Sequence, residues 1–347
     1  MSVETPETSK EAPARSGQHI DERDVNEIIA SIKAAQYLMQ LAAIARLRAF
    51  KPPLFAIWDR LPLGRKAAVL ILLFADRRGD LRVVLTMRAS NLRSYSGQAA
   101  FPGGKADSLD EKPFDIARRE ACEEIGLPRD DSKIPRPFRI EHLCQLPFSF
   151  AKTALAVRPC VAFLHSDDDD KAASVEESMI PRLDAKEVAA VFSAPFHNFL
   201  REEDELQQGD QVAGKISDWY RGQWMDFHGT RWRMHNFYVP INNQNVTKPK
   251  VREGGQAAIA EQLDEEDEGM MRYRVWGMTA RMLVDAARLA YAEEPEFEHN
   301  NHFGDEPMIE DLYKTDRLKE KIPGGPDLTD ADPKTARDTA AAGMAKI

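Results

Sequence analysis

Three glutamates close together in the sequence are suited to holding a metal ion. Glu120, Glu123 and Glu124 fall at positions i, i+3 and i+4, so on a helix their carboxylates project from one face. Three like charges side by side repel one another, and a hard divalent cation with an oxygen shell would offset that repulsion. The spacing therefore predicts a Mg²⁺ site on this helix, with Mn²⁺ as a substitute.

Two neighbours of these glutamates favour the metal site. Arg119 directly precedes Glu120 and is placed to pair with a carboxylate and hold it in one rotamer. Gly104 permits close backbone approach, and its carbonyl is a further candidate oxygen ligand. The alternative is an exposed acidic helix face that binds nothing. A Gly-Gly turn before the helix and Gly126 after it fix the start and stop of the helix, and this favours the metal site.

The elements around this helix indicate a mixed α/β layer fold. Apolar runs at Ala67–Phe74 and Leu81–Thr86 flank a polar loop and predict a hairpin. A helix is expected over Asp115–Ile125, and the apolar run Leu155–Phe163 predicts another strand. The order strand, strand, loop, helix, strand is typical of an α/β fold with a mixed β-sheet.

Other segments extend this unit at both ends. The apolar positions of Val25–Phe50 recur at helical spacing and predict an N-terminal amphipathic helix. A strand hairpin that includes Arg231–Val239 and a helix over Val275–Tyr291 are also expected. We predict a disordered N-terminal tail (1–21), a helical segment (22–60), a catalytic domain (65–292) with a flexible acidic insertion at about 201–271, and a mostly extended C-terminal tail (293–347).

Composition narrows the classes of function. The chain has 347 residues, of which 43% are hydrophobic, and a formal net charge of -10. We expect a folded core and no nucleic-acid partner, because phosphate backbones bind to clustered basic surfaces. The longest apolar run, Ala67–Ala75, is too short to span a bilayer, so no membrane partner is expected. Cys122, Cys144 and Cys160 are widely spaced and are expected to be packing residues.

The region of the glutamates resembles a known motif. The segments Phe101–Lys105 and Arg119–Leu127 are similar to the Nudix box, G-x5-E-x7-R-E-U-x-E-E-x-G-U, where U is a bulky apolar residue. The match is nearly complete from the arginine onward. Two positions differ: the glycine lies fifteen residues before the arginine instead of fourteen, and Ala121 fills an apolar position. The first acidic residue of the box is therefore Asp110 or Glu111.

The resemblance extends upstream of the box. Residues 85–104 look like the accessory motif of coenzyme A diphosphatases, L-L-T-x-(T/R)-(S/A)-x3-R-x3-G-x3-F-P-G-G, with Arg93, Gly97 and Phe101–Gly104 in register. The extra spacer residue after the last glycine is typical of this subfamily. Segments 187–192 and 275–280 are similar to later parts of the same proteins, and a long insertion separates them.

This resemblance implies a Nudix fold, an α/β/α sandwich, and Mg²⁺-dependent hydrolysis of the diphosphate bond of coenzyme A or its derivatives, including oxidised coenzyme A. The products would be adenosine 3′,5′-bisphosphate and 4′-phosphopantetheine or its derivative. One alternative is a Nudix diphosphatase for oxidised purine nucleoside triphosphates or dinucleoside polyphosphates. Another is a catalytically silent Nudix binding module. The upstream motif favours coenzyme A, and the full set of carboxylates disfavours the silent module.

The resemblance also assigns roles to individual residues. Glu120, Glu123 and Glu124 would hold the metal together with the Gly104 carbonyl, and Arg119 would complete the catalytic group.

Cationic residues nearby are candidates for binding the substrate's phosphates. Arg88, Arg93 and Lys105 offer donors, with Gly97 in the same loop, and their alternative role is surface solubility. Glu187 is a candidate extra ligand or general base from a later loop, its alternative being a strand-end carboxylate.

The end of the chain suggests a location. Ala345-Lys346-Ile347 follows the small-basic-aliphatic scheme of the C-terminal peroxisomal address, although a three-residue pattern also arises by chance. We expect a peroxisomal protein recognised by an import receptor, and otherwise a cytoplasmic one.

Overall fold

A computed structural model describes most of the chain. Several expectations fall outside the described residues: the tail before residue 22, the part of the acidic insertion at 249–271, Arg93, Gly97, Glu187 and the last three residues. The described residues are 22–88, 98–166, 175–183, 188–205, 214–227, 230–242, 244, 246–248, 272–320, 328–329 and 331–344.

An eight-stranded mixed sheet forms the centre of the fold, in the order β3-β2-β1-β7-β5 with β4, β6 and β8 attached to β1, β7 and β2. The predicted hairpin is confirmed, because β1 (Lys66–Ala75) pairs antiparallel with β2 (Leu81–Arg88). The strand β7 (Ala156–Ser166) runs parallel to β1. The other strands are β3 (Ala99–Ala100), β4 (Gly103–Lys105), β5 (Phe138–Gln145), β6 (Ser149–Phe150) and β8 (Val188–Pro195).

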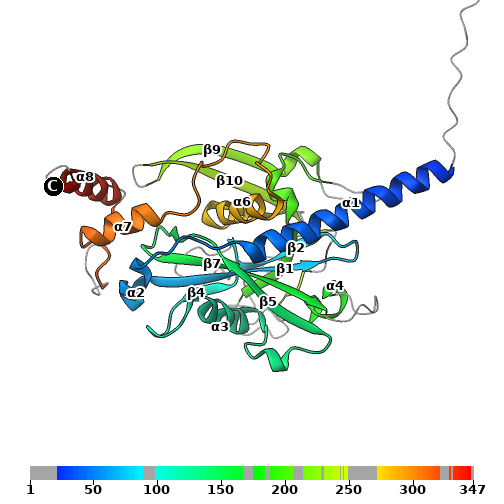
Figure 1. Cartoon of the computed structure of the whole chain (residues 1–347), viewed down its shortest axis with the longest axis horizontal. Helices are drawn as coiled ribbons and strands as arrows, with labels where there is room; N and C mark the ends of the chain where they lie inside the picture. The colour runs from blue at the N-terminus through cyan, green and yellow to red at the C-terminus, as the bar shows by residue number, and fades with distance from the viewer. Residues whose placement is uncertain are drawn as a thin grey trace, which may run out of the picture.

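Helices cover both faces of this sheet, as Figure 1 shows. The helix α3 (Pro113–Ile125) packs on one face, and α6 (Gly277–Tyr291) and α1 (Glu22–Ala49) lie on the other. Apolar side chains on both faces of β1 are buried, which is expected of a strand covered on both sides. The expected mixed α/β fold with a mixed sheet is confirmed.

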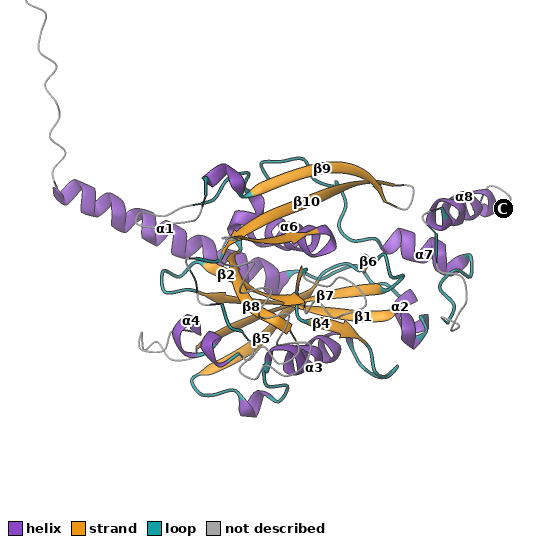
Figure 2. Cartoon of the chain, turned by 180° about the vertical axis from the view of Figure 1, so that it is seen from behind, coloured by secondary structure: helices purple, strands orange, loops and turns teal. Residues whose placement is uncertain are grey.

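A second, three-stranded antiparallel sheet lies beyond α6 (Figure 2). It consists of β9 (Tyr220–Phe227), β10 (Thr230–Pro240) and β11 (Arg272–Trp276), so the expected hairpin is present. The prediction that the last helix begins at Val275 is wrong. Tyr273 and Val275 alternate into the core from β11, and Gly277, with φ of +65°, ends the strand where the helix begins.

The C-terminal part also differs from expectation. Residues 293–347 were expected to be mostly extended, yet they contain α7 (Glu306–Lys314) and α8 (Asp332–Met344). In α7, Ile309 and Leu312 are fully buried, and Met308 and Tyr313 pack against the same core, so four apolar residues at helical spacing dock this helix.

No described helix is long and apolar enough to cross a membrane. The remaining described elements are short helices. They are α2 (Ile57–Arg60), α4 (Val175–Ser178), and the 3-10 turns η1 (Leu63–Arg65), η2 (Asp131–Lys133), η3 (Ile180–Arg182), η4 (His197–Leu200) and η5 (Ile216–Asp218).

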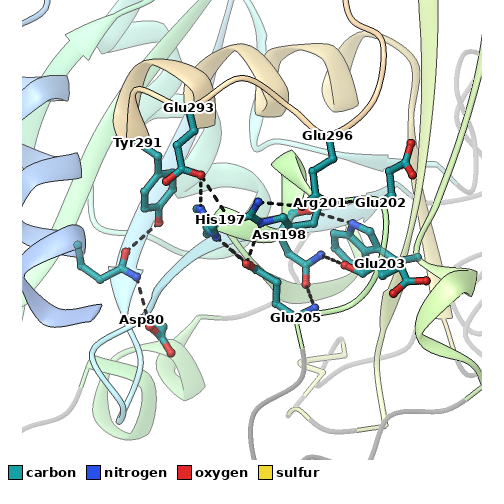
Figure 3. A network of polar contacts seen from close by, with 12 residues as sticks. Asp80, His197, Asn198, Arg201, Glu202, Glu203, Glu205, Tyr291, Glu293 and Glu296 are labelled. Carbon is teal, nitrogen blue, oxygen red and sulfur yellow. Dashed lines mark hydrogen bonds and ion pairs between the residues drawn. The ribbon is translucent and has the colours of Figure 1, made fainter. Parts of the chain in front are cut away.

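A charged network joins η4 to the chain that follows α6 (Figure 3). The two ring nitrogens of His197 lie 2.8 Å from Glu205 Oε1 and 3.1 Å from Glu293 Oε2. Arg201 adds contacts of 3.1 Å to Glu205 and 2.9 Å to Glu296. Since both ring nitrogens face carboxylates, both act as donors when the ring is protonated. Burial lowers the pKa of His197, but the two carboxylates more than offset it, so its pKa is raised.

Candidate active site

The helix α3 ends where the sequence predicts, before Gly126, and it begins two residues earlier than predicted, at Pro113 instead of Asp115. Pro113 occupies its first turn, where the missing N–H costs nothing, and Gly126 ends it in the left-handed conformation with φ of 68°. Ile116, Ala117, Ala121 and Ile125 are fully buried on the sheet side. This packing fixes the rotation of the helix, and with it the direction in which its glutamates leave the backbone.

Arg119 is the centre of the site. Its side chain is only 10% exposed, and its Nη1 lies 3.1 Å from Glu120 Oε1 and 3.2 Å from Glu123 Oε2. Its Nε donates to Glu111 Oε1 at 2.9 Å, and its Nη2 donates to the Lys105 carbonyl at 2.7 Å. One guanidinium therefore holds the helix, the preceding loop and β4 together, as its planar fork of donors allows.

The contacts of Arg119 distinguish between Asp110 and Glu111 as the first acidic residue of the motif. Glu111 pairs with Arg119, and it also accepts a hydrogen bond from the Asp107 N–H at 2.7 Å. Asp110 is exposed, and no contact with Arg119 is found among the described residues. Glu111 also stands eight residues before Arg119, as the box requires, so the extra residue lies between Gly104 and Glu111.

Gly103 and Gly104 were expected to form a turn, but they lie in the strand β4, where they contact the carboxylates of Glu124 and Glu120. Glu124 Oε2 accepts a hydrogen bond from the Gly103 N–H at 3.0 Å. A Cβ on Gly104 would collide with the carboxylate of Glu120, so only glycine lets that carboxylate lie against the strand. Pairing of β4 with β1 fixes the strand itself. Glu120 and Glu124 therefore meet the backbone at adjacent positions.

Burial and charge shift the pKa values in this cluster. Burial raises the pKa of Glu120, with Glu123 and Asp107 adding repulsion and Arg119 opposing the rise. Burial would also raise the pKa of Glu111, but Arg119 holds it below its usual range. Arg119 itself has a raised pKa, because the surrounding carboxylates outweigh its burial. An added cation would therefore stabilise the charged form of Glu120.

The residues present fit a divalent metal in their chemistry. Their donor atoms are carboxylate oxygens, the ligands that Mg²⁺ prefers, and Glu120 lacks full hydration. As the described side chains lie, no three acidic, histidine or cysteine groups converge closely enough to hold an ion. The position of Arg119 explains this, because it draws Glu120 and Glu123 toward itself. A cation would compete with the guanidinium for them, and the ligand set stays a prediction.

Two of the predicted substrate-binding residues lie at this site. Arg88, at the end of β2, has its Nη1 3.9 Å from Glu124 Oε1, and its buried Nε has no hydrogen-bond partner in the described structure. Lys105 ends β4 with an exposed side chain, and its carbonyl binds Arg119. Arg93, Gly97 and Glu187 lie outside the described residues.

Asp107 was not predicted as a site residue. Its Oδ2 lies 3.3 Å from Arg119 Nε, and its backbone N–H binds Glu111. Asp107 has no fixed helical or strand spacing to the glutamates, so its position in the spacer gives no periodic signal. The eight-residue spacing from Glu111 to Arg119 was the one available signal for the loop.

Several known proteins are similar to this chain in sequence. The NUDIX domain matches residues 64–220. Peroxisomal coenzyme A diphosphatase 1 of Saccharomyces cerevisiae is 33% identical over 251 residues, covering 68% of this chain and 71% of the relative. Nudix hydrolase 22, chloroplastic, of Arabidopsis thaliana is 32% identical and covers 67% of this chain. The chain spans only 58% of that plant relative's length.

Among solved structures, a Caenorhabditis elegans Ap4A hydrolase complex is 18% identical over 38% of this chain and 80% of its own, with a TM-score of 0.26. The family follows from the sequence relatives. The matched region contains α3, β4 and the Arg119 cluster, and the yeast relative is covered over more than two thirds of its length. The chain belongs to the Nudix hydrolase family.

Proposed function

We propose that this protein hydrolyses the diphosphate bond of coenzyme A or its derivatives, including oxidised coenzyme A, in a reaction that requires Mg²⁺. Water adds to one phosphorus and the bridging P–O bond breaks. The products are adenosine 3′,5′-bisphosphate and 4′-phosphopantetheine or its derivative.

The observation that carries this proposal is the placement of Glu120 and Glu124 against β4. Both carboxylates are fixed before any ligand arrives, one by Arg119 and the other by the Gly103 N–H. Bound to these carboxylates, Mg²⁺ would offset the charge of the diphosphate and lower the pKa of a water molecule. Such a site supplies most of its rate enhancement by positioning and charge, which suits phosphoryl chemistry.

The protein's own residues divide the remaining tasks. Arg119 holds Glu120 and Glu123 in place, and Arg88 brings a guanidinium group beside Glu124. The Arg88 Nη1 lies 3.9 Å from Glu124 Oε1, which is longer than a hydrogen bond, so a phosphate oxygen could bind this nitrogen at a shorter distance. Arg88 also belongs to the upstream motif that resembles coenzyme A diphosphatases, and a yeast relative at 33% identity carries that name.

The substrate is tested with purified full-length protein and separate incubations with coenzyme A, its disulfide, oxidised dGTP, a dinucleoside polyphosphate and NADH. Products are identified by mass, with Mg²⁺ and with excess chelator. We expect adenosine 3′,5′-bisphosphate from coenzyme A only when Mg²⁺ is present. Faster cleavage of oxidised dGTP or the dinucleoside would favour the first alternative. Binding without turnover of any compound would favour the silent module.

We also propose a peroxisomal location, from the C-terminal tripeptide and the name of the yeast relative. A fluorescent fusion to the N-terminus should colocalise with a peroxisomal marker. Removal of residues 345–347 should return it to the cytoplasm. An unchanged distribution after the truncation would contradict the role of the tripeptide.

A further inference from the structure

The second sheet carries arginines beside aromatic rings on the face turned away from α6. In β10, His235, Phe237 and Val239 are fully buried and alternate with Asn236 and Tyr238. Alternate residues of a strand point to opposite faces, so Asn236 and Tyr238 lie on the outer face.

The neighbouring strands add arginines to that face. Asn236 pairs with Arg221 on one side and Trp276 on the other, and Tyr238 pairs with Arg274. We call Arg221, Asn236, Tyr238, Arg274 and Trp276 the arginine–aromatic face.

Charge on this sheet is opposite to that of the chain. The strands β9, β10 and β11 contain five arginines and one acidic residue, Asp226, in a chain of net charge -10. Arg272 and Arg233 are used internally, by Asp204 and Glu298. Arg221 and Arg274 form no ion pair with any carboxylate that the structure describes. Both are exposed, so their charges are available to an anion.

Each of these two arginines covers an aromatic ring. The guanidinium of Arg221 lies 5.6 Å from the ring centre of Tyr238, and that of Arg274 lies 4.7 Å from the ring of Trp276. Asn236 Oδ1 accepts from Arg274 Nε at 2.9 Å and from Nη2, so the guanidinium is held in place. A planar base can stack on such rings while its phosphate binds the guanidinium groups.

The second sheet contacts the main sheet near the catalytic turn. The strand β11 packs against β3, whose Ala100 is four residues before Gly104. Four residues span at most about 14 Å when fully extended. A substrate whose diphosphate lies beside Glu124 could therefore extend its nucleoside toward β11.

We propose that the arginine–aromatic face binds the adenosine phosphate end of the substrate, with the purine on Tyr238 or Trp276 and a phosphate between Arg221 and Arg274. The two arginines lie on strands that flank β10 and are offset by two residues along it, so they are about 12 Å apart at the backbone, which their long side chains can bridge. The identity of this ligand rests on the proposed function, and the existence of the anion site does not.

Direct binding tests the face without catalysis. Adenosine 3′,5′-bisphosphate is titrated by calorimetry into full-length protein in chelator, and adenosine and inorganic phosphate are titrated separately. The double variant Arg221→Gln with Arg274→Gln should weaken bisphosphate binding at least about tenfold, since each substitution removes a charge-assisted contact with a phosphate. Arg221→Gln alone should give a smaller loss in the same direction.

Arg231→Gln is the matched control. Arg231 is exposed on the same sheet and lies 4.2 Å from the ring of Trp224, but it belongs to the opposite face. Its replacement should change affinity by less than about twofold. Equal affinity in the wild type and the double variant would overturn the proposal. So would tight, arginine-dependent binding of oligoadenylate without bisphosphate binding, which would indicate a single-stranded nucleic-acid surface.

Kinetics separate this proposal from the proposed function. A raised KM for coenzyme A in the double variant supports both. Arginine-dependent bisphosphate binding without coenzyme A hydrolysis would support the face and contradict the proposed function. Hydrolysis of coenzyme A with an unchanged KM and unchanged bisphosphate binding would contradict the face alone.

Discussion

Replacing Glu124 by glutamine separates charge from shape at the site. The side chain is 12% exposed, and its Oε2 accepts a hydrogen bond from the Gly103 N–H at 3.0 Å. The amide oxygen of glutamine can accept the same bond, so β4 and α3 should keep their positions. What disappears is one negative charge beside Arg88 and in the proposed metal site.

The expected effects on stability and turnover differ in size. The pair of Glu124 and Arg88 is long, at 3.9 Å, and Arg88 is 27% exposed, so its loss should cost about 1 kcal/mol or less. Loss of a preorganised charge that stabilises the transition state costs about 3–4 kcal/mol. At about 1.4 kcal/mol per tenfold, turnover should fall by a factor of about 100 to 1000.

Initial rates of coenzyme A hydrolysis at saturating Mg²⁺ measure this loss, and urea denaturation measures stability. Asp115→Asn is the control, because Asp115 is exposed on the first turn of the same helix and should leave turnover unchanged. A Glu124→Gln protein with nearly normal turnover would refute the site assignment. A protein that lost several kcal/mol of stability would refute the claim that the fold tolerates the change.

Three further predictions concern the surroundings of the site and the remote network. Gly104→Ala should displace the Glu120 carboxylate and lower kcat at least about tenfold. The melting temperature should change little, because the displaced group is the flexible end of a side chain. A normal kcat would contradict this. Arg119→Gln should lower the free energy of unfolding by about 3 kcal/mol in urea titrations, because its buried carboxylate partners lose their cation; an unchanged midpoint would contradict the central role of Arg119. His197→Gln tests the network of Figure 3. The pKa of His197 is raised in the folded protein, so the stabilisation that its protonated ring provides is fully present below about pH 6.5 and is lost as the pH rises through the folded pKa. Thermal melts from pH 5.5 to 9 should show the difference from wild type shrinking with pH, and a constant difference would argue against a protonated ring.

Local sequence patterns were sufficient for the elements nearest the chemistry. The helical period placed Glu120, Glu123 and Glu124 on one face of α3, and Gly126 marks its end. The hairpin of β1 and β2 was equally readable, because a polar loop with a central glycine separates two apolar runs. These features depend on neighbours within a few residues, which a single sequence displays directly.

Features that depend on distant pairing were not readable in this way. Val275 fits a helical and a strand pattern equally well, and only the partner strand β10, more than thirty residues earlier, decides for the strand. The helix α7 docks through four apolar residues, which contact core residues that are distant in the sequence. The arginine–aromatic face combines Arg221, Tyr238 and Arg274 from three separate strands, so no local window contains it.

The sequence by itself determined the identity and order of the reactive groups: three glutamates, their arginine and two glycines, spaced by one helix and one turn. The tertiary structure alone decided that Glu111 pairs with Arg119 where Asp110 does not, and that Asp107 joins them. The spacer between β4 and α3 has no repeating backbone geometry, so the direction of each carboxylate there depends on how α3 packs on the sheet.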